Sequence, residues 1–267
     1  MTLEKEKIDV DRIYNMVESS LSTVQRPPKI FAKTRKKQVG SITSAERGQH
    51  ITCVCCMNGI ENFVPPALIF LRKNRKEELL DALPPGSFGL FNETGWMTAD
   101  TFVLWLKHFQ NFVKASLESK VLLPLDGHSN HKSLNALTFA KNNGIIMLCF
   151  PAHCTHRMQP LDVCFYGPLK TFYNQECAIW LKNHPGRVIT QNQIGELFTS
   201  AYGKAATIKN GFLKTGIRPF NTNIFPDDFF EAAETTDRLL EPSNIEEETF
   251  NRPETSVSNE IEDSEVF

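Results

Sequence analysis

The chain has 267 residues, of which 41% are apolar and 22% charged, a composition typical of a globular protein with one large or two small domains. No stretch approaches the roughly 18 consecutive apolar residues of a membrane span, and the N-terminal MTLEKEKIDVDR does not resemble a secretory signal peptide. These features argue against a membrane partner and favour a cytosolic or nuclear compartment where the seven cysteines stay reduced.

Charge is distributed unevenly along the chain. Residues 226–267 contain 14 acidic and two basic residues, which leaves 27 Lys and Arg against 17 Asp and Glu in residues 1–225, a net charge of +10 there. A basic body favours a polyanionic partner. The acidic segment has few periodic apolar residues, so we expect a folded domain over 1–225 followed by a disordered acidic tail over 226–267.

The predicted elements begin with a short strand over residues 9–17. After a basic loop come two strands, 51–58 and 62–71, which form a predicted hairpin around a Gly turn. A helix begins after Thr98, because apolar residues then recur at helical spacing from Phe102 onward.

The second half of the chain alternates strands and helices. Its predicted elements are a strand over 121–126, a helix over 131–143, a strand over 145–150, a long helix over 161–184 with a break at Pro168, and helical stretches over 191–206 and 208–214. Three meander strands followed by this alternation predict a mixed α/β sheet flanked by helices, ribonuclease-H-like in order, with extra C-terminal helices.

One motif, LLPLDGHSNH, places Asp126 at the end of an otherwise apolar strand. Asp126 or Ser129 could cap the following helix, or Asp126 could be a metal-binding carboxylate. A ribonuclease-H-like sheet brings the ends of its first and fourth strands together beside the start of a later helix, where Asp162 lies in QPLD. Two carboxylates alone indicate such a site weakly, because an Asp at a helix N-terminus often only complements the helix dipole.

The stretch LLPLDGHSNHKSLNALTFAKNNGIIMLCFPAHCTHRMQPLDVCFYGPLKTFY resembles the catalytic core of DDE-superfamily endonucleases of the pogo, Tigger and jerky transposase type. Further matches are IYN, KKQVGSITSAERGQHITCVCCMNG, PPALIF, ETGWM and GFLKTGIRPFN, and together they cover residues 12 to about 225. The resemblance implies a nuclear, Mg²⁺- or Mn²⁺-dependent enzyme that cuts and joins DNA. It implies that Asp126 and Asp162 are the second and third of three catalytic, metal-binding carboxylates.

The first of these carboxylates is missing. The family's opening strand reads IYNVDETGL, whereas this chain reads IYNMVESSL and places Val17 at the aspartate position. Glu18 is adjacent, but successive strand side chains face opposite ways, so we expect it to point away from the site. Glu93, in FNETGWM, matches a different family position.

We therefore expect a nucleic-acid-binding domain whose metal site is weak or absent and whose DNA cleavage is lost or much reduced. The alternative is an active Mg²⁺-dependent endonuclease or transposase that uses Glu18 or another carboxylate. The sequence carries no signal for oligomeric state.

Basic and histidine side chains are candidate DNA contacts, with solvated loop charge or loop hydrogen bonding as the alternative. The basic clusters also resemble nuclear import signals. The candidates are Lys33, Arg35, Lys36, Lys37, Arg72, Lys73, Arg75, Lys76, His128, His131 and His156.

A zinc site is a weaker interpretation of the segment around His153, Cys154 and His156. Their spacing matches no common zinc framework, and the cysteines of 53–56 alternate across a predicted strand. The cysteines are better explained as small apolar core residues.

Overall fold

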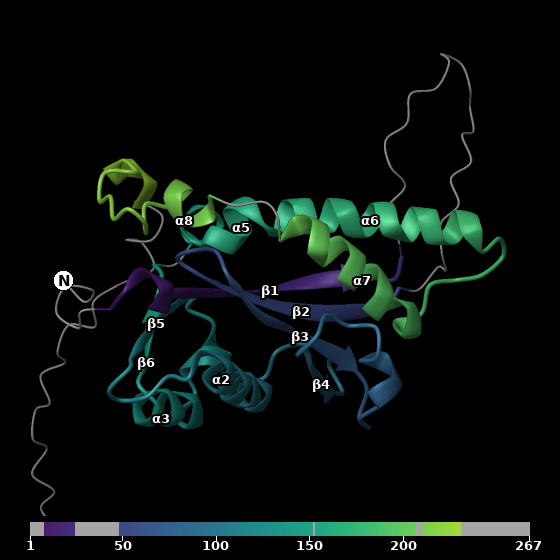
Figure 1. Cartoon of the computed structure of the whole chain (residues 1–267), viewed down its shortest axis with the longest axis horizontal. Coiled ribbons are helices and arrows are strands. Elements are labelled where there is room, and N and C mark those ends of the chain that lie inside the picture. The colour runs from purple at the N-terminus through teal and green to yellow at the C-terminus, as the bar shows by residue number, and fades with distance from the viewer. Residues whose placement is uncertain (1–7, 25–47, 152, 207–209, 231–267) are drawn as a thin grey trace, which may run out of the picture. The chain divides into compact units, whose positions relative to one another are not determined.

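A computed structural model describes residues 8–24, 48–151, 153–206 and 210–230, which all belong to one compact unit (Figure 1). The predicted basic cluster at 33–37 and the acidic segment after residue 230 lie outside the described residues. The last described element, η4 (Asp227–Phe230), is a 3₁₀ turn that falls within the predicted tail.

Four strands form the larger sheet. β1 (Tyr14–Ser22) pairs antiparallel with β2 (His50–Asn58), which pairs antiparallel with β3 (Phe63–Leu71). β4 (Phe88–Asn92) then runs parallel to β3. The first three strands confirm the predicted meander, whereas β4 was not predicted because its short FGLFN run lies within a Gly- and Pro-rich connection.

Two further strands extend this arrangement on the other side of β1. β5 (Val121–Leu125) and β6 (Ile145–Cys149) are parallel, and a parallel bridge between Ile13 and Leu122 joins β5 to the start of β1. The strand order is therefore β4-β3-β2-β1-β5-β6, which contains the ribonuclease-H-like order of three antiparallel strands followed by two parallel ones.

Helices cover both faces of the sheet. α2 and α3 lie on one face and α5, α6 and α7 on the other (Figure 1). The helices are α2 (Ala99–Val113), α3 (Leu134–Asn142), α4 (Thr155–Met158), α5 (Pro160–Cys164), α6 (Tyr166–Asn183), α7 (Gln191–Ala205) and α8 (Gly211–Lys214), with 3₁₀ turns η1 (Val10–Arg12), η2 (Glu77–Leu79) and η3 (Ser129–Lys132).

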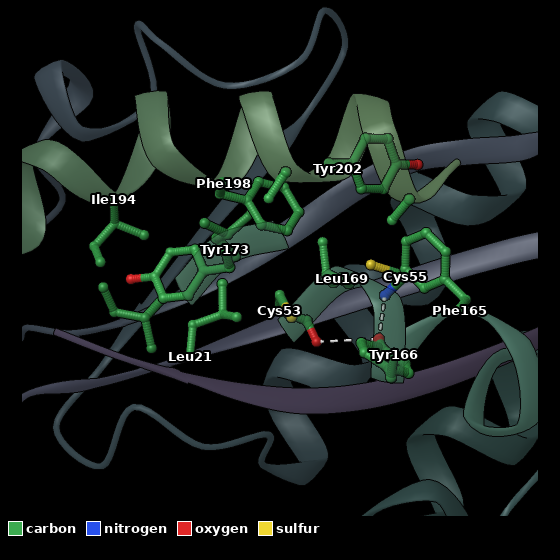
Figure 2. Close-up of a cluster of buried hydrophobic side chains, with 14 of the residues drawn as sticks. Leu21, Cys53, Cys55, Phe165, Tyr166, Leu169, Tyr173, Ile194, Phe198 and Tyr202 are labelled. Atoms are coloured by element: carbon green, nitrogen blue, oxygen red, sulfur yellow. Dashed lines mark hydrogen bonds between the residues drawn. The ribbon is translucent and has the colours of Figure 1, made fainter. Parts of the chain in front are cut away.

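Strand alternation divides the interior into two cores. Val17 and Leu21 of β1 face the helices α5 to α7, whereas Tyr14 and Met16 face α2 and α3. Figure 2 shows the first core, in which Leu21 lies among aromatic side chains of α6 and α7. Burying each large apolar side chain stabilises the fold by roughly 1.5–3 kcal/mol, so both faces hold the sheet in place.

The predicted first strand was misplaced at its beginning. Residues 10–12 form η1, and β1 instead extends to Ser22, opposite His50 of β2. The turn at η1 is held by Arg12, whose guanidinium donates hydrogen bonds to the carbonyls of Val113 and Ser119. The segment IDVDR alternates apolar and polar residues over its first four positions, as a strand does, so the local pattern did not reveal the turn.

The predicted break in the long helix is confirmed, but it falls at Phe165, between α5 and α6. Pro168 has no backbone N–H and cannot donate to the carbonyl of Cys164, four residues earlier. The helix predicted over 131–143 is likewise divided, because Ser133 ends η3 and its side chain caps α3.

All seven cysteines are free thiols, and six of them are buried. Cys53, Cys55 and Cys56 of β2 are at most 2% exposed, and burial raises the pKa of Cys55 and Cys56 well above the ordinary value. These thiols pack as small apolar side chains.

Candidate active site

Asp126 directly follows β5, where the parallel strands end. The Ile13–Leu122 bridge, continued four residues along each strand, brings Asp126 level with Val17. Its Oδ1 atom accepts the backbone N–H of His128 at 3.1 Å and lies 2.9 Å from His131 Nδ1. Partial burial raises the pKa of Asp126, but the hydrogen bond and charge of His131 outweigh this, and the net pKa is lowered.

His131 lies between two carboxylates. Its Nε2 atom is 2.9 Å from Glu18 Oε1, while Nδ1 contacts Asp126, and only 4% of its side chain is exposed. The ring packs against Phe102 of α2, with ring centroids 4.5 Å apart. Burial lowers the pKa of His131, but the hydrogen bonds to Asp126 and Glu18 together outweigh burial and raise it to about 9. His131 is therefore a charged bridge between β1 and the end of β5.

Asp162 lies in the first turn of α5. Its carboxylate makes no hydrogen bond or ion pair with another described residue. Although the residue is exposed, nearby protein atoms restrict its hydration, and this effect raises its pKa. The charge of Asp126 raises the pKa further, to about 6, against the opposing effects of Lys170 and His156. Asp126 and Asp162 are thus near enough to repel each other.

The buried amide of Asn15 holds the two aspartate-bearing elements in register. Its Nδ2 atom donates to the Pro124 carbonyl of β5 at 3.2 Å and to Gln159 Oε1 at 3.3 Å, and its Oδ1 accepts the Leu161 N–H at 3.1 Å. Asn15 is fully buried, and Gln159 is 2% exposed. Because these hydrogen bonds link β1, β5 and α5, they fix the positions from which Asp126 and Asp162 project.

Val17 is 8% exposed and belongs to the same apolar core as Phe165 and Tyr166. The Tyr166 hydroxyl donates to the Val17 carbonyl at 2.6 Å and accepts the Cys55 N–H at 3.2 Å. Figure 2 shows this hydroxyl reaching the backbone of β2. Val17 and Cys55 are direct β1–β2 partners, so the Tyr166 oxygen lies in the ladder beside Val17.

Glu18 lies on the opposite face of β1 from Val17, as alternation predicted. Even so, it is only one side chain away from Asp126, because His131 spans the gap. His131 was predicted only as a candidate DNA contact, and no sequence pattern indicated this bridge. Glu93 is remote from the bridge: it follows β4, and its carboxylate lies 3.6 Å from Lys73 Nζ.

These residues fit one divalent ion better than two. Asp126 Oδ1 is occupied by His131 and His128, so Oδ2 and the free carboxylate of Asp162 are the anionic oxygens available to a cation. The mutual repulsion of the two carboxylates is what a cation would relieve. Val17 offers no oxygen at the third position, and no group of three or more His, Cys, Asp or Glu within the described ranges is arranged to hold a metal. The same finding gives no support to a zinc site.

The predicted DNA contacts differ in how available they are. Within the described basic loop, Lys73, Arg75 and Lys76 pair with Glu93, Glu77 and Glu78 respectively. His128 and His156 are exposed, whereas His131 is buried and cannot touch DNA directly.

A ribonuclease-H-like sheet with acidic side chains after β5 and at the start of α5 is the framework of a phosphodiester-cleaving or phosphodiester-transferring domain. Residues 49–207, more than half of the chain, match the family described as DDE superfamily endonuclease. The chain belongs to this family.

Two curated proteins are similar to the chain in sequence. The chain is 27% identical over 184 residues to a Cochliobolus lunatus protein named MFS-type transporter clz9, and 29% identical over 114 residues to the human pogo transposable element with ZNF domain. These alignments cover 67% and 42% of this chain but 20% and 8% of the relatives, so the chain spans a small part of their length. No helix among the residues with described positions is long and apolar enough to cross a membrane.

Solved structures of the Mos1 transposase are also similar. The strand transfer complex of Mos1 gives a TM-score of 0.49 at 11% identity, covering 90% of this chain and 59% of that one. The Mos1 catalytic domain with raltegravir and Mn gives a TM-score of 0.42 at 10% identity, covering 90% of each chain.

Proposed function

We propose that this chain is a transposase-derived DDE domain that binds nucleic acid in the nucleus and has lost most or all of its metal-dependent DNA cleavage. The observation that carries this proposal is Val17, an apolar side chain packed into the core at the strand position level with Asp126. Family membership supplies the expected chemistry, and Val17 removes the oxygen ligand that a two-ion site needs there.

The remaining carboxylates limit what the site can hold. Asp126 and Asp162 would hold a single Mg²⁺ or Mn²⁺ weakly, because one oxygen of Asp126 is engaged by His131. When bound, such an ion would supply Lewis-acid stabilisation of phosphodiester oxygens. Efficient two-metal cleavage requires a second ion that these residues do not provide for.

Two observations support nucleic-acid binding: the positive net charge of residues 1–225 and the similarity to transposases. The net charge of +10 over residues 1–225 favours a polyanion. The pogo-type relative is named as a transposable element, and the Mos1 relative has been solved in complex with a transposon end. Exposed His128 and His156 flank the aspartates and would face DNA bound there.

The test is nicking of supercoiled plasmid in Mn²⁺ by the unaltered chain, Asp162→Asn, Val17→Asp, Val17→Asn and Val17→Asp/Asp162→Asn. We expect cleavage only from Val17→Asp. The side chain introduced by Val17→Asn has the shape of aspartate but lacks its charge, so that variant should not cut. Cleavage by the unaltered chain that Asp162→Asn abolishes would show that the native site is active.

The alternative function is cleavage that uses Glu18 in place of the missing aspartate. The bridge through His131 is the observation that favours it, because Glu18 lies one side chain away from Asp126. Its position on the opposite face of β1 opposes it. If the unaltered chain cuts plasmid and Glu18→Gln does not, this alternative replaces the proposal.

A further inference from the structure

A cavity of about 470 Å³ lies between the loop that follows β3 and the N-terminus of α7. It is distinct from the aspartate site. Its wall includes Leu71 at the end of β3 and Gln49, next to His50, which pairs with Ser22 at the far end of β1. Ser22 is five residues beyond Val17, or roughly 16 Å along an extended strand. The cavity therefore lies at the far end of the same sheet, well away from Asp126.

Arg72 contributes an unbalanced positive charge to this cavity. The other cations of the loop, Lys73, Arg75 and Lys76, each pair with a glutamate. The guanidinium of Arg72 makes no hydrogen bond or ion pair with another residue in the described part of the chain. Its backbone N–H donates to the carbonyls of Phe70 and Asn92, both at 2.9 Å, which anchors the residue at the cavity wall.

Gln191, the first residue of α7, contributes unpaired polar groups on the opposite wall. The residue is 6% exposed, yet its side-chain amide makes no hydrogen bond with another described residue and is not sealed from solvent, which it reaches through the cavity it lines. Its backbone N–H is also unpaired among the described residues, because the Thr190 side chain caps the N–H groups of Asn192 and Gln193.

The rigid setting of α7 keeps these groups in place. The helix has 15 residues, so its N-terminus carries the partial positive charge of the helix dipole. Thr199, two turns further on, donates a hydrogen bond to the Ala82 carbonyl at 2.6 Å and fixes the helix against the segment after η2. The Gln191 amide, the Gln191 N–H and the Arg72 guanidinium thus line one cavity, and none of them has a partner among the described residues.

We infer that this cavity binds one phosphate group of a nucleic-acid backbone, an inference that rests on the proposed nucleic-acid binding. The planar fork of Arg72 suits two oxygens of a phosphate, and the Gln191 N–H groups donate to the others. One phosphate is the limit, because the glutamates of the loop already balance its remaining cations. The cavity would hold the duplex at a second point beyond the aspartate site.

The experiment measures binding of the full chain to a short fluorescent DNA duplex by anisotropy at several salt concentrations. Arg72→Gln should weaken binding at low salt several-fold and lower the salt slope by about 0.9, the value for one lost phosphate contact. Gln191→Leu should weaken binding without changing the slope, since it removes no charge. Lys107→Gln is the control, because it removes one exposed positive charge from α2, outside the cavity wall, and it should change neither quantity.

Equal affinity and equal slope for Arg72→Gln and the unaltered chain would overturn the phosphate site while leaving DNA binding intact. If the unaltered chain does not bind DNA, the proposed function fails, and titration with inorganic phosphate followed by amide NMR decides the cavity separately. A shift of the Gln191 resonances in the unaltered chain and in Lys107→Gln, but not in Arg72→Gln, would support an anion site for free phosphate. The absence of a shift would overturn it.

Discussion

His131 Nε2 lies 2.9 Å from Glu18 Oε1, so a carboxylate on β1 is connected through a buried histidine to Asp126, which directly follows β5. The bridge places a positive charge against Asp126 and occupies one of its oxygens. Glu18 is next to Val17 in the sequence, but its carboxylate is already paired with His131.

His131→Asn should destabilise the protein by about 1–3 kcal/mol at pH 6, because it leaves two partly buried carboxylates without their common partner. The folded-state pKa of His131 is raised to about 9 from 6.5, so this contribution is complete below pH 6.5 and is lost as pH rises through 9. Urea unfolding of both proteins at pH 6 and pH 10 measures the change. His128→Asn, which alters an exposed neighbour, is the control and should show no comparable loss. A deficit for His131→Asn that is equally large at pH 10 would contradict the charged bridge.

Val17→Asp should lower Tm in the absence of divalent ions, because a carboxylate replaces an apolar side chain in the core without a partner. Millimolar Mn²⁺ should then raise Tm more in Val17→Asp than in the unaltered chain, since a ligand that binds only the folded state stabilises it. Thermal melts with Mn²⁺ and with EDTA measure both effects. Val17→Asn introduces a side chain with the shape of aspartate but without its charge, so Mn²⁺ should not raise its Tm further. An equal rise of Tm in Val17→Asn and Val17→Asp would exclude a restored metal site.

Asp162→Asn should raise Tm by a few degrees at pH 7 in EDTA. The folded-state pKa of Asp162 is raised to about 6 from 3.8, so the folded state favours the protonated acid, and that stability is lost as pH rises through 6. The gain from the substitution should therefore vanish below pH 3.8. Asp126→Asn should have the opposite effect, because the pKa of Asp126 is lowered and its charge is favoured. Melts at pH 7 and pH 3.5 compare the two, and a loss of Tm in both variants at pH 7 would contradict the repulsion.

Tyr166→Phe should cost about 1–3 kcal/mol, because it leaves a buried N–H of Cys55 and the Val17 carbonyl without their shared partner. Guanidinium unfolding with an unchanged m-value measures the loss. Tyr173→Phe is the matched control in the same helix. Its hydroxyl donates to the Ser22 carbonyl at 3.1 Å and interacts with the Cys177 thiol, without bridging β1 and β2, so the substitution should cost less. Equal costs would mean that the β1–β2 ladder closes without the Tyr166 hydroxyl.

Much of the sheet could be predicted from sequence, because apolar runs such as ITCVCC and VLLPL are bounded by clear turns. β4 escaped prediction because five residues in a Gly- and Pro-rich segment carry little periodicity. The start of β1 was misplaced because Arg12 satisfies distant carbonyls, a tertiary contact that no local pattern reports.

The two carboxylates of the candidate site were predicted from the sequence, but the residues that hold them in place were not. Motif spacing identified Asp126 and Asp162, and alternation placed Val17 and Glu18 on opposite faces. The roles of Asn15 and Gln159 emerge only when β1, β5 and α5 meet in space. The available signal was a lone amide inside the apolar run IYNMV, since a buried amide must find partners.

The amide of Asn15 has a consequence for the surroundings of residue 17. Because one side chain aligns β1, β5 and α5 without help from residue 17, a substitution at that position leaves Asp126 and Asp162 on elements held by the same hydrogen bonds. The framework of the candidate site and the chemical identity of residue 17 are therefore separable, since a buried amide two positions earlier in β1 sets the framework.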